Sequence, residues 1–156
     1  MSEGIGARVL RKEDKRFITG KGRYTDDIIE ANQAYAAFVR SPHAHARIVS
    51  LDTSAALAME GVETVLTGPE LVADGIGNII CGWGITSKDG TPMNMGAWSA
   101  LATEKVRYVG DAVAIVVADS KSQAKLAAEA VVVTYEELPV VVGSVEALAS
   151  GAPQLH

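Results

Sequence analysis

The chain has 156 residues, of which 48% are apolar, 21% charged and 5% aromatic. This composition is typical of one globular domain with a core of Val, Ile, Leu and Ala, and it excludes a disordered chain. The net charge of -5, with basic residues scattered along the chain, argues against nucleic acid or an anionic membrane as a partner.

The sequence also limits the compartment. Cys81 is the only cysteine, so no internal disulfide can form. No apolar run approaches the length that spans a bilayer. The N-terminus, Met1–Gly4, has no basic stretch followed by an apolar one, as a signal peptide would. We therefore expect a cytoplasmic protein with no membrane partner.

Residues 1–27 are rich in glycine and charge and are expected to lie at the surface. Gly20-Lys21-Gly22 suggests a phosphate-binding loop, but the Walker spacing is absent, and neither a preceding strand nor a following helix is predicted. A surface turn is the better interpretation of these three residues.

Two strands are predicted next, at 34–39 and 46–51. Pro42 separates them, because proline cannot donate to a strand ladder and keeps the residue before it extended. Between the strands, His43 and His45 stand two positions apart. In an extended chain this spacing places both imidazoles on one face, as a metal pair would require.

The metal interpretation of the two histidines is weak. No third ligand lies nearby in the sequence, and the remaining histidine, His156, is the last residue and is expected to be frayed. Arg40 and Arg47 flank the pair and would disfavour a bound cation. We therefore expect structural or hydrogen-bonding roles for both histidines.

Short elements of alternating type follow. Asp52 or Thr53 can cap a helix that closes at Gly61, the position where a left-handed residue is common. Thr67-Gly68-Pro69-Glu70 combines a capping box with a proline in the first helical turn. These signals predict a helix through Met59, a strand at 62–66 and a helix at 70–73.

The longest expected loop is about 75–100, where glycines and Pro92 interrupt any helical or strand periodicity of apolar residues. Such long loops are usually functional or mobile. Cys81 could be a nucleophile only beside a base, and the sequence supplies none, so an inert thiol is expected. Four apolar side chains of the loop could form an exposed patch that promotes self-association, namely Ile79, Ile80, Trp83 and Trp98.

A β-α-β unit is predicted at 106–135. Residues 112–118 form an unbroken apolar run of strand length, bounded by turn residues, which is typical of a strand buried on both faces. Ser120 can cap the helix that follows, and Val131 to Tyr135 is β-branched and predicts a second strand. The crossover is long enough for the two strands to pair in parallel. Ala124, Ala127, Ala128 and Val131 share the expected buried face of the helix.

After Pro139, residues 140–142 could continue the sheet, and Ser144 could cap a last helical turn through Leu148. The adjacent carboxylates Asp26-Asp27 and Glu136-Glu137 point in different directions and are interpreted as turn and surface residues. No dinucleotide fingerprint, HExxH, EF-hand or nucleophile elbow is present. From the residues alone we assign no catalytic, cofactor-binding or metal-binding residue.

Four blocks of the sequence stand out: Arg11-Lys12-Glu13-Asp14 with TGKGRYTDDI, FVRSPHAHARI with LDTSAA, GVETVLTG, and KVRYVGDAVAIVVADS with VTYEELPVVV. In this order they resemble the beginning of the large, molybdopterin-binding subunit of the xanthine dehydrogenase and aldehyde oxidase family, and are nearest to aerobic carbon monoxide dehydrogenase. The resemblance runs from about Gly6 to His156. Only residues 75–100 depart from it, which leaves the substrate class open.

The resemblance implies a single α/β-hammerhead domain over 1–156, an α/β (α+β) fold of interleaved short strands and helices. In the family a molybdopterin-binding region follows, which carries molybdenum and the catalytic glutamate; that region is expected to be absent here, so no site residue is carried over. The complete enzyme would use molybdopterin (cytosine dinucleotide) with molybdenum, and iron-sulfur and FAD subunits would be partners. This chain alone is expected to be a structural part of an oxidoreductase, without cofactor and without activity.

An alternative from a different class remains open at this point. The chain could be a stand-alone scaffold domain that binds a small ligand or a protein through its long loop. The sequence does not fix the substrate of a parent enzyme, the oligomeric state or the role of the loop. Nor does it decide between a natural short protein and part of a longer one.

Overall fold

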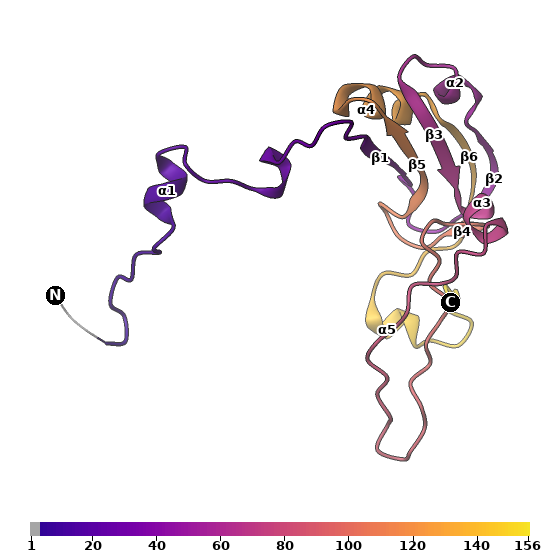
Figure 1. Ribbon diagram of the computed structural model, residues 1–156. Helices are drawn as coiled ribbons and strands as arrows, with labels where there is room; N and C mark the ends of the chain where they lie inside the picture. The colour runs from indigo at the N-terminus through magenta and orange to yellow at the C-terminus, as the bar shows by residue number, and fades with distance from the viewer. Residues whose placement is uncertain (1–3) are drawn as a thin grey trace. The chain divides into compact units, whose positions relative to one another are not determined.

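The computed structural model describes residues 4–156, which divide after Gln33 into two compact units (Figure 1). The first unit contains helix α1 (Asp14–Ile18) and the 3-10 helix η1 (Thr25–Asp27), and none of its described residues is buried. Gly20 follows α1 with a φ of 68°, so this glycine lies in a turn. The sequence did not predict α1, which is five residues long and mostly charged.

The second unit is built on two three-stranded sheets with the strand orders β1-β5-β3 and β4-β2-β6. All four strand pairs are antiparallel. The strands predicted at 34–39, 46–51, 62–66, 112–118 and 131–135 are present, with ends within two residues of the prediction, and the short strand β4 was not predicted. The strand bounds are β1 (Tyr35–Arg40), β2 (Ala46–Asp52), β3 (Val62–Thr67), β4 (Lys105–Val106), β5 (Ala112–Ala118) and β6 (Val132–Glu137).

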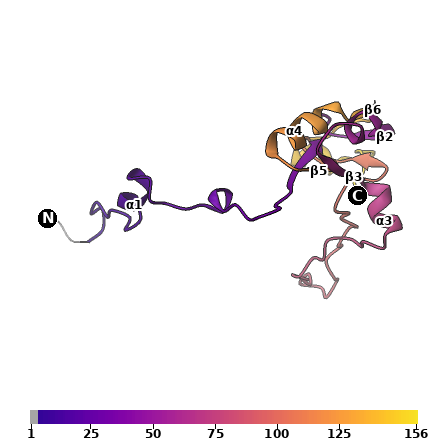
Figure 2. The ribbon, with the colours of Figure 1, turned by 45° about the horizontal axis from the view of Figure 1, so that its top comes forward.

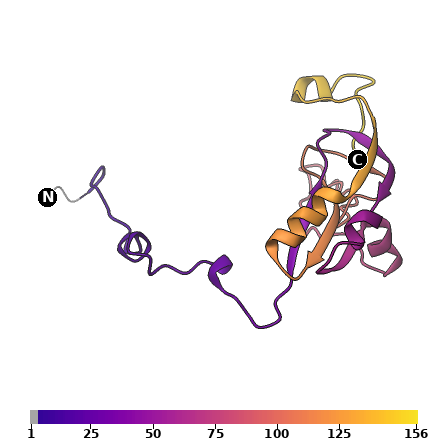
Figure 3. The ribbon, with the colours of Figure 1, turned by 90° about the horizontal axis from the view of Figure 1, so that it is seen from above.

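Strand β5 is the centre of its sheet and helix α4 (Lys121–Ala130) packs against it and β1 (Figures 2 and 3). Burial on both faces of the strand is confirmed, with Val113 and Val116 fully inaccessible. The Ser120 hydroxyl accepts a hydrogen bond from the Gln123 backbone N–H at 3.2 Å, as its capping role predicts. Ala124 and Ala127 of α4 are buried, which allows the helix to approach the sheet closely.

The predicted parallel pairing within the β-α-β unit is wrong. Both edges of β5 are occupied, by β1 and β3, so β6 cannot pair with β5. After α4 the chain enters the other sheet, where β6 pairs with β2 from Asp52↔Val132 to Ala46↔Glu137. The crossover length allowed a parallel pair but did not require one, because the competing partners are distant in sequence.

Two groups of buried residues form the core. One group, between the first sheet, α4 and α2 (Ser54–Leu57), contains Ala56, Val65, Ala114, Val116, Ala127 and Val131. The other contains Ala46, Ala102, Val106 and Val113 and joins the two sheets. Val39, Leu51 and Val133 pack against both groups, so one continuous apolar interior links the sheets.

Two glycines have specific packing roles. Gly61 adopts a φ of 78° after α2, as predicted for the end of that helix, which stops at Leu57 and not at Met59. Gly68 begins α3 (Gly68–Ala73), and a Cβ atom there would lie only 2.3 Å from the Ala102 carbonyl oxygen. The Glu70 carboxylate accepts a hydrogen bond from the Thr67 N–H at 2.8 Å, so the predicted capping box forms.

The remaining segments are mostly irregular. Residues 75–100 extend away from the sheets in Figure 1 and contain one isolated bridge, Thr86↔Pro92. Residues 140–142 form no strand, because the chain leaves the sheet at Pro139, and helix α5 (Ser144–Ala147) is capped by Gly143 and not by Ser144. Among the described residues, no helix is long and apolar enough to cross a membrane.

Candidate functional site

The two blocks that carry the resemblance most specifically, RSPHAHARI and YVGDAVA, meet in space. The Ser41 N–H donates to the Asp111 carbonyl at 2.8 Å, and the Gly110 N–H donates to the Ser41 carbonyl at 2.8 Å. The Arg40 guanidinium also donates to the Gly110 carbonyl at 2.9 Å. Gly110 has a φ of 93°, a conformation that L side chains rarely adopt. We call residues 40–47 and 107–111 the paired turns.

His45 connects the paired turns to the end of β6. Its side chain is only 6% exposed, and its Nδ1 donates to the Pro139 carbonyl at 2.8 Å. In return, the Leu138 N–H donates to the His45 carbonyl at 3.0 Å. The other ring nitrogen, Nε2, is buried and has no hydrogen-bond partner among the described residues. His45 therefore holds residues 138 and 139 against the β1–β2 turn.

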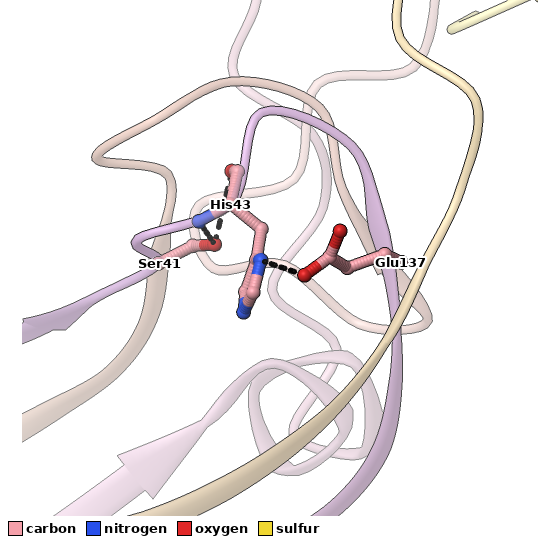
Figure 4. Close-up of polar contacts among 3 residues, drawn as sticks. All are labelled: Ser41, His43 and Glu137. Atoms are coloured by element: carbon pink, nitrogen blue, oxygen red, sulfur yellow. Dashed lines mark hydrogen bonds and ion pairs between the residues drawn. The ribbon is translucent and has the colours of Figure 1, made fainter.

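His43 has a different environment (Figure 4). Its backbone N–H donates to the Ser41 hydroxyl at 3.0 Å, and its Nδ1 lies 3.6 Å from Glu137 Oε1. The ring also packs against Tyr135, with 4.9 Å between ring centroids. An ion pair with Glu137 forms only when the imidazole is protonated.

Both histidines lie in the turn between β1 and β2, as their position between the two predicted strands implies. Each imidazole faces a separate protein partner, so the two rings do not share one face. Within residues 4–156, no three side chains of His, Cys, Asp or Glu gather as a metal site would require. This arrangement gives both histidines structural contacts.

Tyr108 lies within the paired turns, and Tyr135 of β6 packs against His43. Burial raises the pKa of the Tyr108 hydroxyl, and the negative charge of Asp111 adds to this increase. Burial also raises the pKa of the Tyr135 hydroxyl, while its hydrogen bond with Ser41 opposes the increase. Both hydroxyls therefore stay protonated at neutral pH and can donate hydrogen bonds, but they cannot serve as bases.

The adjacent carboxylates have separate surface contacts. Glu136 accepts from the Arg47 guanidinium at 3.0 Å, and Glu137 faces His43. Asp27 accepts from the Tyr24 N–H at 2.8 Å and caps η1. These contacts agree with the predicted turn and surface roles and give the carboxylates no common target.

The second candidate surface is an apolar trough on the long loop, with a volume of about 340 Å³. The predicted exposure of apolar loop residues is confirmed: Ile80 is 88% exposed and Trp83 is 78% exposed. Cys81 is also exposed, and its thiol lies 3.7 Å from the Trp83 carbonyl. The trough is lined by Ile79, Ile80, Cys81, Met93, Met95, Gly96 and Trp98.

His156 was expected to be frayed, and this prediction is wrong. Its ring stacks against Trp98 with 5.8 Å between centroids, and Trp98 also stacks against Tyr108 at 6.0 Å. Sequence reasoning missed this cluster because its members are separated by ten to almost sixty positions in an irregular part of the chain. Their aromatic character was the only available signal.

Residues 19–139 match a family model described as aldehyde oxidase and xanthine dehydrogenase, a/b hammerhead domain. The chain is 42% identical over 154 residues to the carbon monoxide dehydrogenase large chain of Hydrogenophaga pseudoflava, covering 98% of this chain and 18% of that protein. It is 37% identical over 139 residues to the xanthine dehydrogenase molybdenum-binding subunit of Escherichia coli O157:H7, covering 89% and 18% respectively.

Among solved structures, quinoline 2-oxidoreductase from Pseudomonas putida 86 superposes with a TM-score of 0.79 at 40% identity. This match covers 95% of the chain and 18% of the neighbour. The chain thus spans less than a fifth of the length of the relatives that it matches.

Proposed function

Because this chain belongs to the aldehyde oxidase and xanthine dehydrogenase family, as its a/b hammerhead domain, we propose that it is the N-terminal structural domain of the large subunit of a molybdenum hydroxylase. The family resemblance and the α/β-hammerhead fold predicted from the sequence are both confirmed by these similarities. The single observation that carries the proposal is the similarity over 98% of this chain to a large chain about five times its length.

The proposed parent enzyme is an oxidoreductase that hydroxylates a carbon centre or oxidises carbon monoxide. Relatives with carbon monoxide dehydrogenase and xanthine dehydrogenase names support this reaction class. The isolated chain is expected to oxidise carbon monoxide, aldehydes and purines at no measurable rate. A stand-alone scaffold is not favoured, because the similarity to enzyme subunits extends over nearly the whole chain.

The proposed enzyme would bind molybdenum through molybdopterin, as its cytosine dinucleotide form, outside this domain. The domain's own residues fit such a role poorly, because His45 is used against Pro139 and His43 lies beside Glu137. When bound elsewhere in the subunit, the cofactor would supply the redox chemistry. Proposed partners are the molybdopterin-binding region and iron-sulfur and FAD subunits, and the proposed location is the cytoplasm.

The apolar loop surface supports a packing role. A domain that works alone rarely presents large apolar side chains such as Ile80 and Trp83 at 88% and 78% exposure on one loop. Burial against the molybdopterin-binding region would remove this surface from water. The paired turns and the two sheets provide the rigid base from which the loop extends.

A chimera tests the proposal. The matched segment of the Hydrogenophaga pseudoflava large chain would be replaced by this chain, and molybdenum content and carbon monoxide oxidation would be measured after purification. We expect both to be retained, because the domain supplies packing and the cofactor site lies elsewhere. The control chimera carries Val116→Asp, which places a charge in the core and should abolish assembly. Loss of molybdenum from the first chimera, with the parent enzyme fully loaded, would contradict the proposal.

A further inference from the structure

Trp98 has contacts with two segments that are far apart in the sequence. Its indole lies nearly parallel to the Tyr108 ring, at 27°, and nearly parallel to the His156 ring, at 22°. Aromatic rings in such arrangements attract each other beyond the area that they bury. The ring therefore joins the turn before β5 to the segment at 153–156.

A second contact holds the same segment. Arg107 Nε donates to the Leu155 carbonyl at 2.7 Å, while the Arg107 backbone N–H donates to the Asp111 carboxylate at 3.0 Å. Gly96 lies close enough that an added Cβ would be 3.6 Å from His156. A small hollow of about 20 Å³ at this place is lined by Trp98, Arg107, Tyr108, Asp111 and His156, among others.

Trp98 also belongs to the long loop. Its carbonyl accepts from the Ile79 N–H at 2.7 Å, which closes the base of the loop, and its side chain forms one wall of the apolar trough. One residue thus contacts the trough, the base of the loop and the segment at 153–156. A displacement of any of these elements would disturb the contacts of the others.

We infer that Trp98 and Arg107 form a clamp that holds residues 153–156 and the base of the loop as one unit against the turn at 107–111. The clamp fixes the trough in one orientation. If the proposed function holds, the clamp also fixes residues 153–156 next to the surface that the molybdopterin-binding region would cover. Trp98 and Arg107 are positioning residues in this arrangement.

The clamp can be measured in the chain alone. Trp83→Phe leaves Trp98 as the only tryptophan, so acrylamide quenching of the remaining fluorescence reports the exposure of that ring. In this background, His156→Ala and Arg107→Ala should each raise the quenching constant, because the stacked ring or its anchor is lost. Leu148→Ala, an exposed apolar truncation in the same part of the chain, should leave the constant unchanged.

The reciprocal measurement follows residues 153–156 by 15N relaxation. Trp98→Ala should lower the heteronuclear NOE of these residues. In Trp98→Phe, which keeps an aromatic ring, the NOE should stay close to the wild-type value. Unchanged quenching in His156→Ala, a change at the surface that cannot prevent folding, would overturn the inference. So would unchanged relaxation in Trp98→Ala. Because no other component is added, failure here is distinct from failure of the chimera, which tests the proposed function.

Discussion

His45 Nδ1 lies 2.8 Å from the carbonyl oxygen of Pro139, 94 positions away in the sequence. This contact joins the β1–β2 turn to the point where β6 ends. It is also reciprocal, since the Leu138 N–H donates to the His45 carbonyl at 3.0 Å. These two hydrogen bonds hold residues 138 and 139 where the chain leaves the sheet. They give the buried histidine of the RSPHAHARI block, His45, a structural role.

Replacing His45 by alanine should lower the free energy of unfolding by about 1 to 3 kcal/mol, because the Pro139 carbonyl loses its donor inside the protein. His43→Ala is the matched control, since this side chain is partly exposed and lies 3.6 Å from Glu137. Its effect should be roughly 0.5 kcal/mol or less. Urea unfolding measures the stability of both variants. Equal losses of unfolding free energy would show that the contact with Pro139 does not stabilise the fold.

Val116 is fully buried in β5, so Val116→Ala should cost about 1 to 3 kcal/mol of stability as a core truncation. Lys125→Ala on the exposed face of α4 should change stability by roughly 0.5 kcal/mol or less. Thermal and urea unfolding of the two variants give the comparison. Similar values would mean that β5 is not the central strand of the core.

Gly68→Ala should destabilise the protein by about 1 to 3 kcal/mol, because the new Cβ would lie 2.3 Å from the Ala102 carbonyl oxygen and the backbone would have to move. Gly77→Ala is the control, because no atom lies within 4 Å of the added Cβ and the backbone there has no positive φ. That variant should unfold at the wild-type urea midpoint. A stable Gly68→Ala protein would contradict the close packing of α3 on residues 101 and 102.

Burial raises the pKa of Tyr135 above its ordinary value of 10.0, which makes stability depend on alkaline pH. The folded state binds this proton more tightly than the unfolded chain does. The contribution to stability is therefore complete below pH 10 and is lost as pH rises through the higher pKa of the folded protein. Tyr135→Phe should show a shallower loss of stability in this range, measured as urea midpoints, and an identical slope would contradict the burial of the hydroxyl.

Much of the fold could be predicted because the local signals were strong. The apolar run at 112–118, the cap at Ser120 and the capping box at 67–70 each depend on residues close in sequence, and the structure forms all three. The partner of a strand does not depend on such residues. Periodicity indicates that β5 is buried on both faces, but it does not tell that β1 and β3 occupy its edges.

The candidate site was harder to predict for the same reason. Spacing alone suggested that His43 and His45 share a face, but the turn after Pro42 directs them to Glu137 and Pro139, which lie far along the chain. The clamp at Trp98 combines residues from three distant segments, and no local pattern marks it. Only the family resemblance, which rests on whole sequence blocks, predicted more than local structure.

If the domain packs through its loop surface against a molybdopterin-binding region, as proposed, the two should associate in solution. Sedimentation velocity of the chain, mixed with the Hydrogenophaga pseudoflava large chain lacking its matched segment, measures this association. The segment from that large chain serves as the positive control. We expect a one-to-one complex that weakens with Ile80→Ser and Trp83→Ser and is unchanged by Lys125→Ala. A chain that stays free while the control segment binds, or a complex of unchanged affinity in both loop variants, would show that the loop surface does not bind this region.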